Sequence, residues 1–235
     1  MKKRFAAVLT SLLLLMLLVP AAAFATGGHT VNGDLNLTSG TTNTTLENDG
    51  YTWDASTHTL TMQDLTVKGN IQLPNAECTI NVKGNCSVGE IRRDDSGAAQ
   101  AVTIKGETGA VLNSSVSVPG SLTLDSIVLT GDRIWNSTTN PGYILKVENS
   151  NITLHHQLMW MTADGMELIN SSFKLDSNTD SGQFWVQKIA MDENSIVESY
   201  RPMQNYGNFT PNDLGAVNNY IAEPAGGSFQ NKGPS

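Results

Sequence analysis

Between residues 122 and 178 the chain repeats one pattern three times: LTLDSIVL (122–129), LKVENSNITL (145–154) and LINSSFKL (168–175). Each copy consists of a short run of alternating apolar and polar residues, a polar corner, and a second short alternating run. The copies begin about 23 residues apart, a spacing typical of solenoid repeats. The repeat therefore predicts a solenoid.

The same pattern extends outward over most of the chain in steps of about 20 to 23 residues. The apolar anchors are Leu60, Ile80, Val102, Leu122, Leu145, Leu168 and Ile189. A bend is expected four positions after each anchor, at Asp64, Gly84, Gly106, Ser126, Asn149, Ser172 and Glu193. We predict an all-β fold, a single-stranded right-handed parallel β-helix of about seven coils with N- and C-terminal caps, because one coil alone cannot bury its apolar stripe. The alternative is an antiparallel sandwich, which also has short strands at regular spacing.

The ends of the chain differ from the repeats. Residues 1–25 combine a basic start, an apolar run and the small-x-small motif Ala23-Phe24-Ala25, which predicts a signal peptide and a secreted, extracellular protein with no membrane attachment after cleavage. Residues 26–59 are expected to form an N-terminal cap and first partial coil, and residues 60–199 the parallel β-helix. Residues 200–235, interrupted by prolines, are expected to form a C-terminal cap and tail.

The composition limits the partners. The chain has 235 residues and a formal net charge of −8, which becomes about −11 when Lys2, Lys3 and Arg4 leave with the signal peptide. An acidic chain has no electrostatic reason to bind nucleic acid, and acidic polysaccharides such as pectate are disfavoured in the same way. The sequence does not indicate an oligomeric state.

The segment GYTWDASTHTLTM (50–62), followed by GNIQLP (69–74), resembles exported right-handed β-helix proteins of Gram-positive bacteria. These proteins belong to the pectate-lyase-like solenoid class and are often non-catalytic surface or carbohydrate-binding modules. The resemblance implies a polysaccharide or a cell-surface glycan as the partner. Its motifs are structural, so it does not imply a reaction.

Three tryptophans recur at close to the coil spacing. Trp135, Trp160 and Trp185 are each 25 residues apart and are expected to stack on successive coils. On the outside of the solenoid they would form a flat binding platform for sugar rings. The polar partners of such a platform would be Asn136, Gln183 and Gln187. On the inside the same residues would form an ordinary aromatic ladder.

The densest charge cluster is Arg92-Arg93-Asp94-Asp95. It could bind a sugar carboxylate, or Ca²⁺ through the two aspartates, and the alternative is a solvated loop. His155 and His156 are adjacent, so in a regular strand they face opposite sides and cannot share one metal ion. We predict no other cofactor and no metal site.

No catalytic residues can be assigned. Residues 178–180 (Asn-Thr-Asp) resemble the first motif of the polygalacturonase family, but the paired-aspartate, histidine and Arg-x-Lys motifs that should follow are missing. We therefore favour a non-catalytic protein that binds glycans or surface material. A polysaccharide lyase or glycoside hydrolase acting on an outer face is the first alternative, and a structural spacer or adhesin module is the second.

Two cysteines remain, Cys78 and Cys86, on either side of the corner at Gly84-Asn85 and in phase with inward-facing residues. An exported chain can join them in a disulfide. The alternative is a pair of buried thiols that pack as small apolar groups.

Overall fold

A computed structural model describes residues 28–38, 44–93, 99–136, 142–160, 162, 164–176, 183–186, 189–199, 203–204 and 228–231. The expected signal peptide and most of the expected C-terminal cap lie outside these residues. The described chain is almost entirely β-structure, with one short helix, α2 (Leu46–Asp49). Within the same residues no helix is long and apolar enough to cross a membrane.

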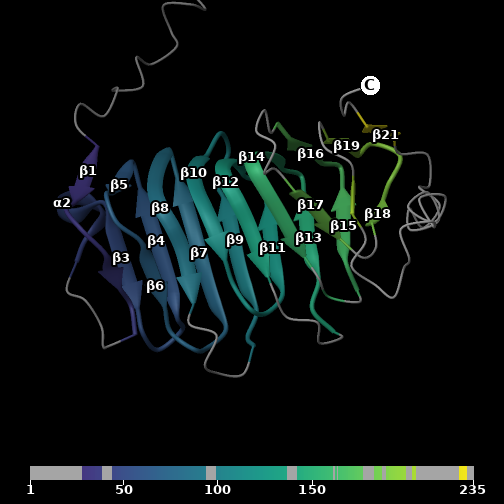
Figure 1. Ribbon diagram of the computed structural model, residues 1–235. Helices are drawn as coiled ribbons and strands as arrows, with labels where there is room; N and C mark the ends of the chain where they lie inside the picture. The colour runs from purple at the N-terminus through teal and green to yellow at the C-terminus, as the bar shows by residue number, and fades with distance from the viewer. Residues whose placement is uncertain are drawn as a thin grey trace, which may run out of the picture.

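The strands form two sheets, which run side by side along the molecule (Figure 1). The eight-stranded sheet contains β3 (Tyr51–Asp54), β4 (Thr59–Gln63), β7 (Cys78–Lys83), β9 (Val102–Gly106), β11 (Leu122–Asp125), β13 (Leu145–Glu148), β15 (Met166–Ile169) and β18 (Ile189–Met191). The thirteen-stranded sheet contains β1 (His29–Val31), β2 (Leu35–Asn36), β5 (Leu65–Val67), β6 (Ile71–Leu73), β8 (Asn85–Arg93), β10 (Val111–Ser117), β12 (Val128–Asn136), β14 (Asn151–Trp160), β16 (Ser172–Leu175), β17 (Gln183–Val186), β19 (Ile196–Ser199), β20 (Met203–Gln204) and β21 (Ser228–Asn231).

The strand pairing confirms the parallel solenoid and excludes the antiparallel sandwich. Every strand pair is parallel except β3 with β4, an antiparallel hairpin at the N-terminal edge of the eight-stranded sheet. Figure 1 shows the coils stacked in chain order, from the purple N-terminal strands to the yellow-green C-terminal ones. The solenoid has about five turns. This is fewer than the seven coils expected from the apolar anchors.

Each coil passes through two bends before a connecting segment returns it to the eight-stranded sheet. The first bend joins a strand of the eight-stranded sheet to the next strand of the thirteen-stranded sheet. The second bend lies within the thirteen-stranded sheet, where β8 pairs first with β5 and then with β6, and β14 pairs first with β16 and then with β17. β8 and β14 therefore each consist of two shorter strands joined end to end.

The interior consists of aliphatic ladders, and the predicted anchors belong to two of them. Leu60, Ile80 and Leu168 stand in one ladder. Val102, Leu122, Leu145 and Ile189 stand in the neighbouring ladder, two positions earlier along the strand. Both positions face inward, because side chains two residues apart in a strand share a face. Sequence spacing alone cannot distinguish them.

The first bend depends on residues with positive φ, and four of the seven predicted positions have it. Asp64, Ser126 and Asn149 have φ of 46°, 56° and 49°, and Gly84 has 62°. Asp and Asn tolerate this left-handed conformation better than other side chains do.

The remaining three positions do not have positive φ, and two of them, Gly106 and Ser172, are displaced from the bend. Gly106 ends β9, and the positive φ comes at Gly109 after an inserted turn. Ser172 already begins β16, and Asn170 is the residue with positive φ in that coil. Glu193 lies in a turn that the Ser195 amide closes by donating to the Asp192 carbonyl.

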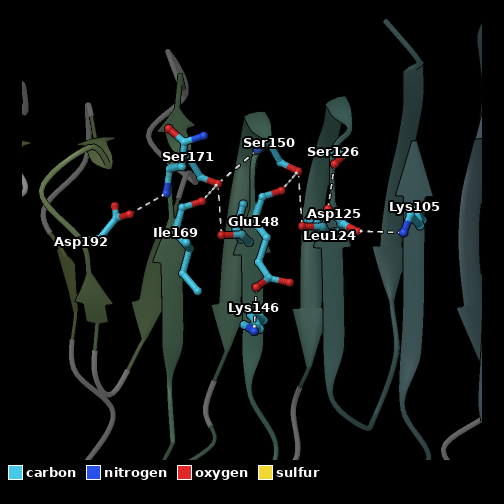
Figure 2. Close-up of polar contacts among 12 residues, drawn as sticks. Lys105, Leu124, Asp125, Ser126, Lys146, Glu148, Ser150, Ile169, Ser171 and Asp192 are labelled. Atoms are coloured by element: carbon cyan, nitrogen blue, oxygen red, sulfur yellow. Dashed lines mark hydrogen bonds and ion pairs between the residues drawn. The ribbon is translucent and has the colours of Figure 1, made fainter. Parts of the chain in front are cut away.

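A ladder of buried serines closes the first bend in the C-terminal half (Figure 2). The Ser171 hydroxyl accepts from the Ser150 amide at 3.1 Å, and the Ser150 hydroxyl accepts from the Ile127 amide at 3.1 Å. The Ser171 amide donates in turn to the Ser195 hydroxyl at 3.1 Å. Each serine thus satisfies a buried amide of the preceding coil, which an apolar residue could not do.

The two cysteines are free and buried, so of the two alternatives that the sequence leaves open, the structure has the pair of packed thiols. Cys78 begins β7 and Cys86 lies beyond the first bend. β7 alone rises roughly 3.3 Å per residue over six residues, which carries the two residues far beyond the roughly 7 Å between α-carbons that a bridge allows. Burial raises the pKa of both thiols, which therefore stay protonated at neutral pH.

Candidate functional site

The second bend is irregular on four successive coils. The pairing register shifts between Asn113 and Ser115 of β10, and again between Gly131 and Arg133 of β12. A side chain on Gly131 would come within 2.1 Å of the Ser114 carbonyl oxygen of the neighbouring coil, so the coils approach closely here. Register shifts of this kind mark a β-bulge or a similar irregularity, which bends a strand and redirects its side chains.

A groove of about 480 Å³ lies along these bulges. It is lined by Gly89 and Glu90 of β8, Ser115 of β10, Asp132 and Arg133 of β12, and His155 and His156 of β14. One solenoid face thus brings together residues from four coils. We call this site the bulge groove.

Arg133 contacts both Glu90 and Trp135 at the bulge groove. Its Nε and a terminal guanidinium nitrogen donate to one carboxylate oxygen of Glu90, at 3.2 and 3.0 Å. Its guanidinium carbon also lies 5.5 Å from the centre of the Trp135 ring. Glu90 and Arg133 belong to strands on either side of β10, so the pair reaches across Ser115. Arg133 therefore lines the groove and also contacts the partly exposed Trp135.

His155 and His156 both line the bulge groove, contrary to the expectation that they face opposite sides. The strict alternation assumed for a regular strand is lost at the bulge, where the register of β12 and β14 shifts. Within the described part of the chain, no three His, Cys, Asp or Glu residues come together in a way that could hold a metal ion.

The predicted tryptophan column is split. Trp135, Met159 and Trp185 stand opposite one another on neighbouring strands, and Trp135 and Trp185 are partly exposed. Trp160 instead stands opposite Asn136 and is fully buried. Trp160 therefore follows the interior alternative, while the other two tryptophans lie on the outer side.

The polar partners expected around the tryptophans are only partly described. Asn136 is 1% exposed, and its amide donates to the Gly120 carbonyl at 2.9 Å, so it braces the interior and does not offer a surface ligand. Gln183 belongs to β17, but its side chain lies outside the described residues, as does the whole of Gln187.

The two arginines of the charge cluster make hydrogen bonds to other parts of the protein. Arg93 is 4% exposed and donates to the carbonyl oxygens of Pro74, Ala76 and Gln100, so it clamps two loops together. Arg92 donates to the Gln72 side-chain oxygen at 3.0 Å. Asp94, Asp95 and the 178–180 motif lie outside the described residues.

A second hollow, of about 430 Å³, lies beside the eight-stranded sheet. Its two cations are paired with acids: Lys83 with Glu107 at 2.7 Å, and Lys105 with Asp125 at 3.5 Å. Among the described residues that line it, none is aromatic or a histidine. The bulge groove, with its histidines and adjoining tryptophan, is therefore the better candidate site.

Compared with protein-family models, with curated proteins and with solved structures, the chain finds no match. The assignment of a site therefore depends on the geometry of the molecule itself.

Glu90, Ser115, Asp132 and Arg133 were not among the predicted site residues. One signal in the sequence marks their place: in VLTGDRIW (128–135) the alternation of apolar and polar residues breaks at Gly131-Asp132. Such a break within an otherwise regular strand indicates a bulge, and bulges are common beside functional sites.

Proposed function

We propose that the protein is a secreted, non-catalytic β-solenoid that binds glycans in the bulge groove. The observation that carries this proposal is that Arg133 lines a polar groove and also contacts a partly exposed tryptophan, Trp135. Sugar rings have hydroxyls along their edges and apolar faces, so their sites combine a few polar groups with an aromatic surface.

The groove has suitable groups for sugar hydroxyls. The Asp132 carboxylate accepts hydrogen bonds, the Arg133 guanidinium donates them, and the Ser115 hydroxyl can do either. The two histidines add further donors and acceptors at the β14 side. Trp135 lies beside this set and supplies the ring surface.

The likeness of residues 50–74 to exported β-helix proteins of Gram-positive bacteria supports the same proposal. Those proteins are often surface or carbohydrate-binding modules, and residues 1–25 have the composition of a signal peptide. A secreted position would place the groove among extracellular or cell-surface glycans.

A glycoside hydrolase or lyase acting in the same groove is the second candidate, because the groove contains two carboxylates, Glu90 and Asp132. Glu90 already accepts both hydrogen bonds from Arg133, which favours a structural task for this carboxylate. A structural spacer or adhesin module without a small ligand is the third candidate.

A glycan array with the full chain after signal removal, run in parallel with an assay for released reducing or unsaturated ends, separates the three. The proposal expects glycan retention without depolymerisation, and at least about ten-fold weaker binding by Trp135→Ala at an unchanged melting temperature. Released ends that disappear in Asp132→Asn would instead establish the enzyme. A protein that retains no glycan would leave only the spacer or adhesin.

A further inference from the structure

The bulge groove contains one fully charged cation among its described lining residues, the Arg133 guanidinium. That guanidinium is already engaged, because two of its nitrogens donate to a single oxygen of Glu90, at 3.2 and 3.0 Å. Its carbon also lies 5.5 Å from the Trp135 ring centre. A ligand carboxylate that binds side-on, through Nε and the same terminal nitrogen, would compete with Glu90 for these donors. One that approaches the other terminal nitrogen would meet a guanidinium whose charge is already balanced by Glu90.

The sheet fixes the geometry of this pair. β8 and β12 both pair with β10, so the backbones of Glu90 and Arg133 are held on either side of Ser115. The Glu90 side chain is only 15% exposed, whereas that of Arg133 is 42% exposed. The carboxylate therefore lies deeper than the guanidinium and is less accessible to competing water or salt.

We infer that Glu90 determines the charge preference of the bulge groove: by occupying Arg133, it confines the groove to uncharged glycans and excludes acidic ones. This inference rests on the proposed glycan binding and adds the class of glycan and the residue that selects it. Asp132 acts in the same direction, because an unpaired carboxylate in the groove repels a ligand carboxylate.

The test is a change of specificity caused by removing Glu90. Glu90→Ala frees the guanidinium and should raise affinity for an oligogalacturonate by about ten-fold or more, since a hydrogen bond to a charged group is worth at least that factor. Affinity for a neutral oligosaccharide of the same length should change by less than about three-fold. Glu90→Gln keeps the shape and removes only the charge, so a smaller gain is expected.

Two further variants make the result specific. Glu148→Ala frees Lys146, its partner at 2.7 Å on the eight-stranded sheet, and changes the net charge by the same amount, so it should not gain acidic binding. In the double variant Glu90→Ala/Arg133→Gln the gain should disappear, because the freed cation is no longer there. Melting temperatures report whether each variant is folded.

The outcomes for the two proposals can be distinguished. If folded Glu90→Ala and Glu90→Gln gain no affinity for oligogalacturonate, or if the wild-type protein already binds it as well as neutral sugars, Glu90 does not set the preference. If the wild-type protein binds no glycan but the two variants gain acidic binding through Arg133, the role of Glu90 stands and the proposed function fails.

Discussion

Both bends of each coil change the direction of the chain, but they do so with different structures. At the first bend, residues such as Asn149 and Asn170 adopt positive φ, and buried serines join one coil to the next. At the second bend the strands bulge, neighbouring backbones crowd at Gly131, and charged side chains line an open groove. Buried serine hydroxyls satisfy backbone amides at the first bend, whereas charged side chains line a groove at the second.

We propose that this difference separates stability from recognition within a single repeat. A regular ladder makes each coil support its neighbours, which is how solenoids gain stability. An irregular bend loses some of the regular strand pairing. Such departures from regular structure are expected at functional sites. The groove lies at the irregular bend, whereas the serine ladder lies at the regular one.

The largest effect is expected from Gly131→Val at the second bend. A β-carbon there would lie 2.1 Å from the Ser114 carbonyl oxygen, which is backbone and cannot move aside. We expect a loss of about 3 kcal/mol in the free energy of unfolding, measured by urea denaturation. Thr130→Val, on the same strand, changes side-chain shape away from this contact and should stay within about 0.5 kcal/mol. Equal stabilities of the two variants would show that the coils do not approach closely at Gly131.

The next effect belongs to the first bend. Ser171→Ala removes the acceptor of the buried Ser150 amide and should cost about 1–3 kcal/mol of unfolding free energy. Ser172→Ala is the matched control, because this neighbouring hydroxyl donates outward to the Asn151 side chain at 2.8 Å. The control should cost no more than about 0.5 kcal/mol. A ladder that contributes to stability is ruled out if both variants denature at the same urea concentration.

The smallest effect is a pH dependence at the C-terminal end of the first-bend ladder. The Ser195 hydroxyl donates to Asp192 at 2.5 Å and, with the amide of Asn170, lowers the pKa of this carboxyl below its ordinary value. A lowered folded-state pKa contributes stability above the unfolded pKa of about 4, and this stability is lost as the pH falls through the folded pKa.

Thermal unfolding between pH 6 and pH 2 measures this contribution. Asp192→Asn should flatten the wild-type loss of stability below about pH 4, and Ser195→Ala should flatten it in part, because the Ser195 hydrogen bond is its largest cause. Identical pH profiles for the wild type and Asp192→Asn would contradict this assignment.

The sequence predicts the parallel solenoid and much of the first bend, because both repeat locally. Asp64, Ser126 and Asn149 were located correctly as bends from their position after an apolar anchor. Other bends differ from their predicted positions for two reasons. A turn is inserted before Gly109, and each strand has two equivalent inward positions that can be taken as the anchor. These bends are displaced by only a few residues, within coils that were predicted correctly.

The site could not be predicted in the same way, because its contacts depend on exact register. Trp135 stands opposite Met159, 24 residues later, so a tryptophan spaced by 25 residues moves one position along the strand. A shift of one residue turns a side chain to the opposite face, which places Trp160 inside. Glu90 and Arg133 are 43 residues apart and meet only because two bulged strands flank β10.

The most direct test of the central division is a pair of matched aspartate substitutions, one at each bend. Asp132 lines the bulge groove, whereas Asp125 lies beside the first bend, where it accepts from Ser126 at 2.7 Å. The measurement is the affinity of Asp132→Asn and of Asp125→Asn, by titration calorimetry, for a neutral oligosaccharide that the wild type retains. We predict at least about ten-fold weaker binding for Asp132→Asn and wild-type affinity for Asp125→Asn. Wild-type affinity in a folded Asp132→Asn, with binding lost in Asp125→Asn, would contradict the placement of recognition at the bulged bend.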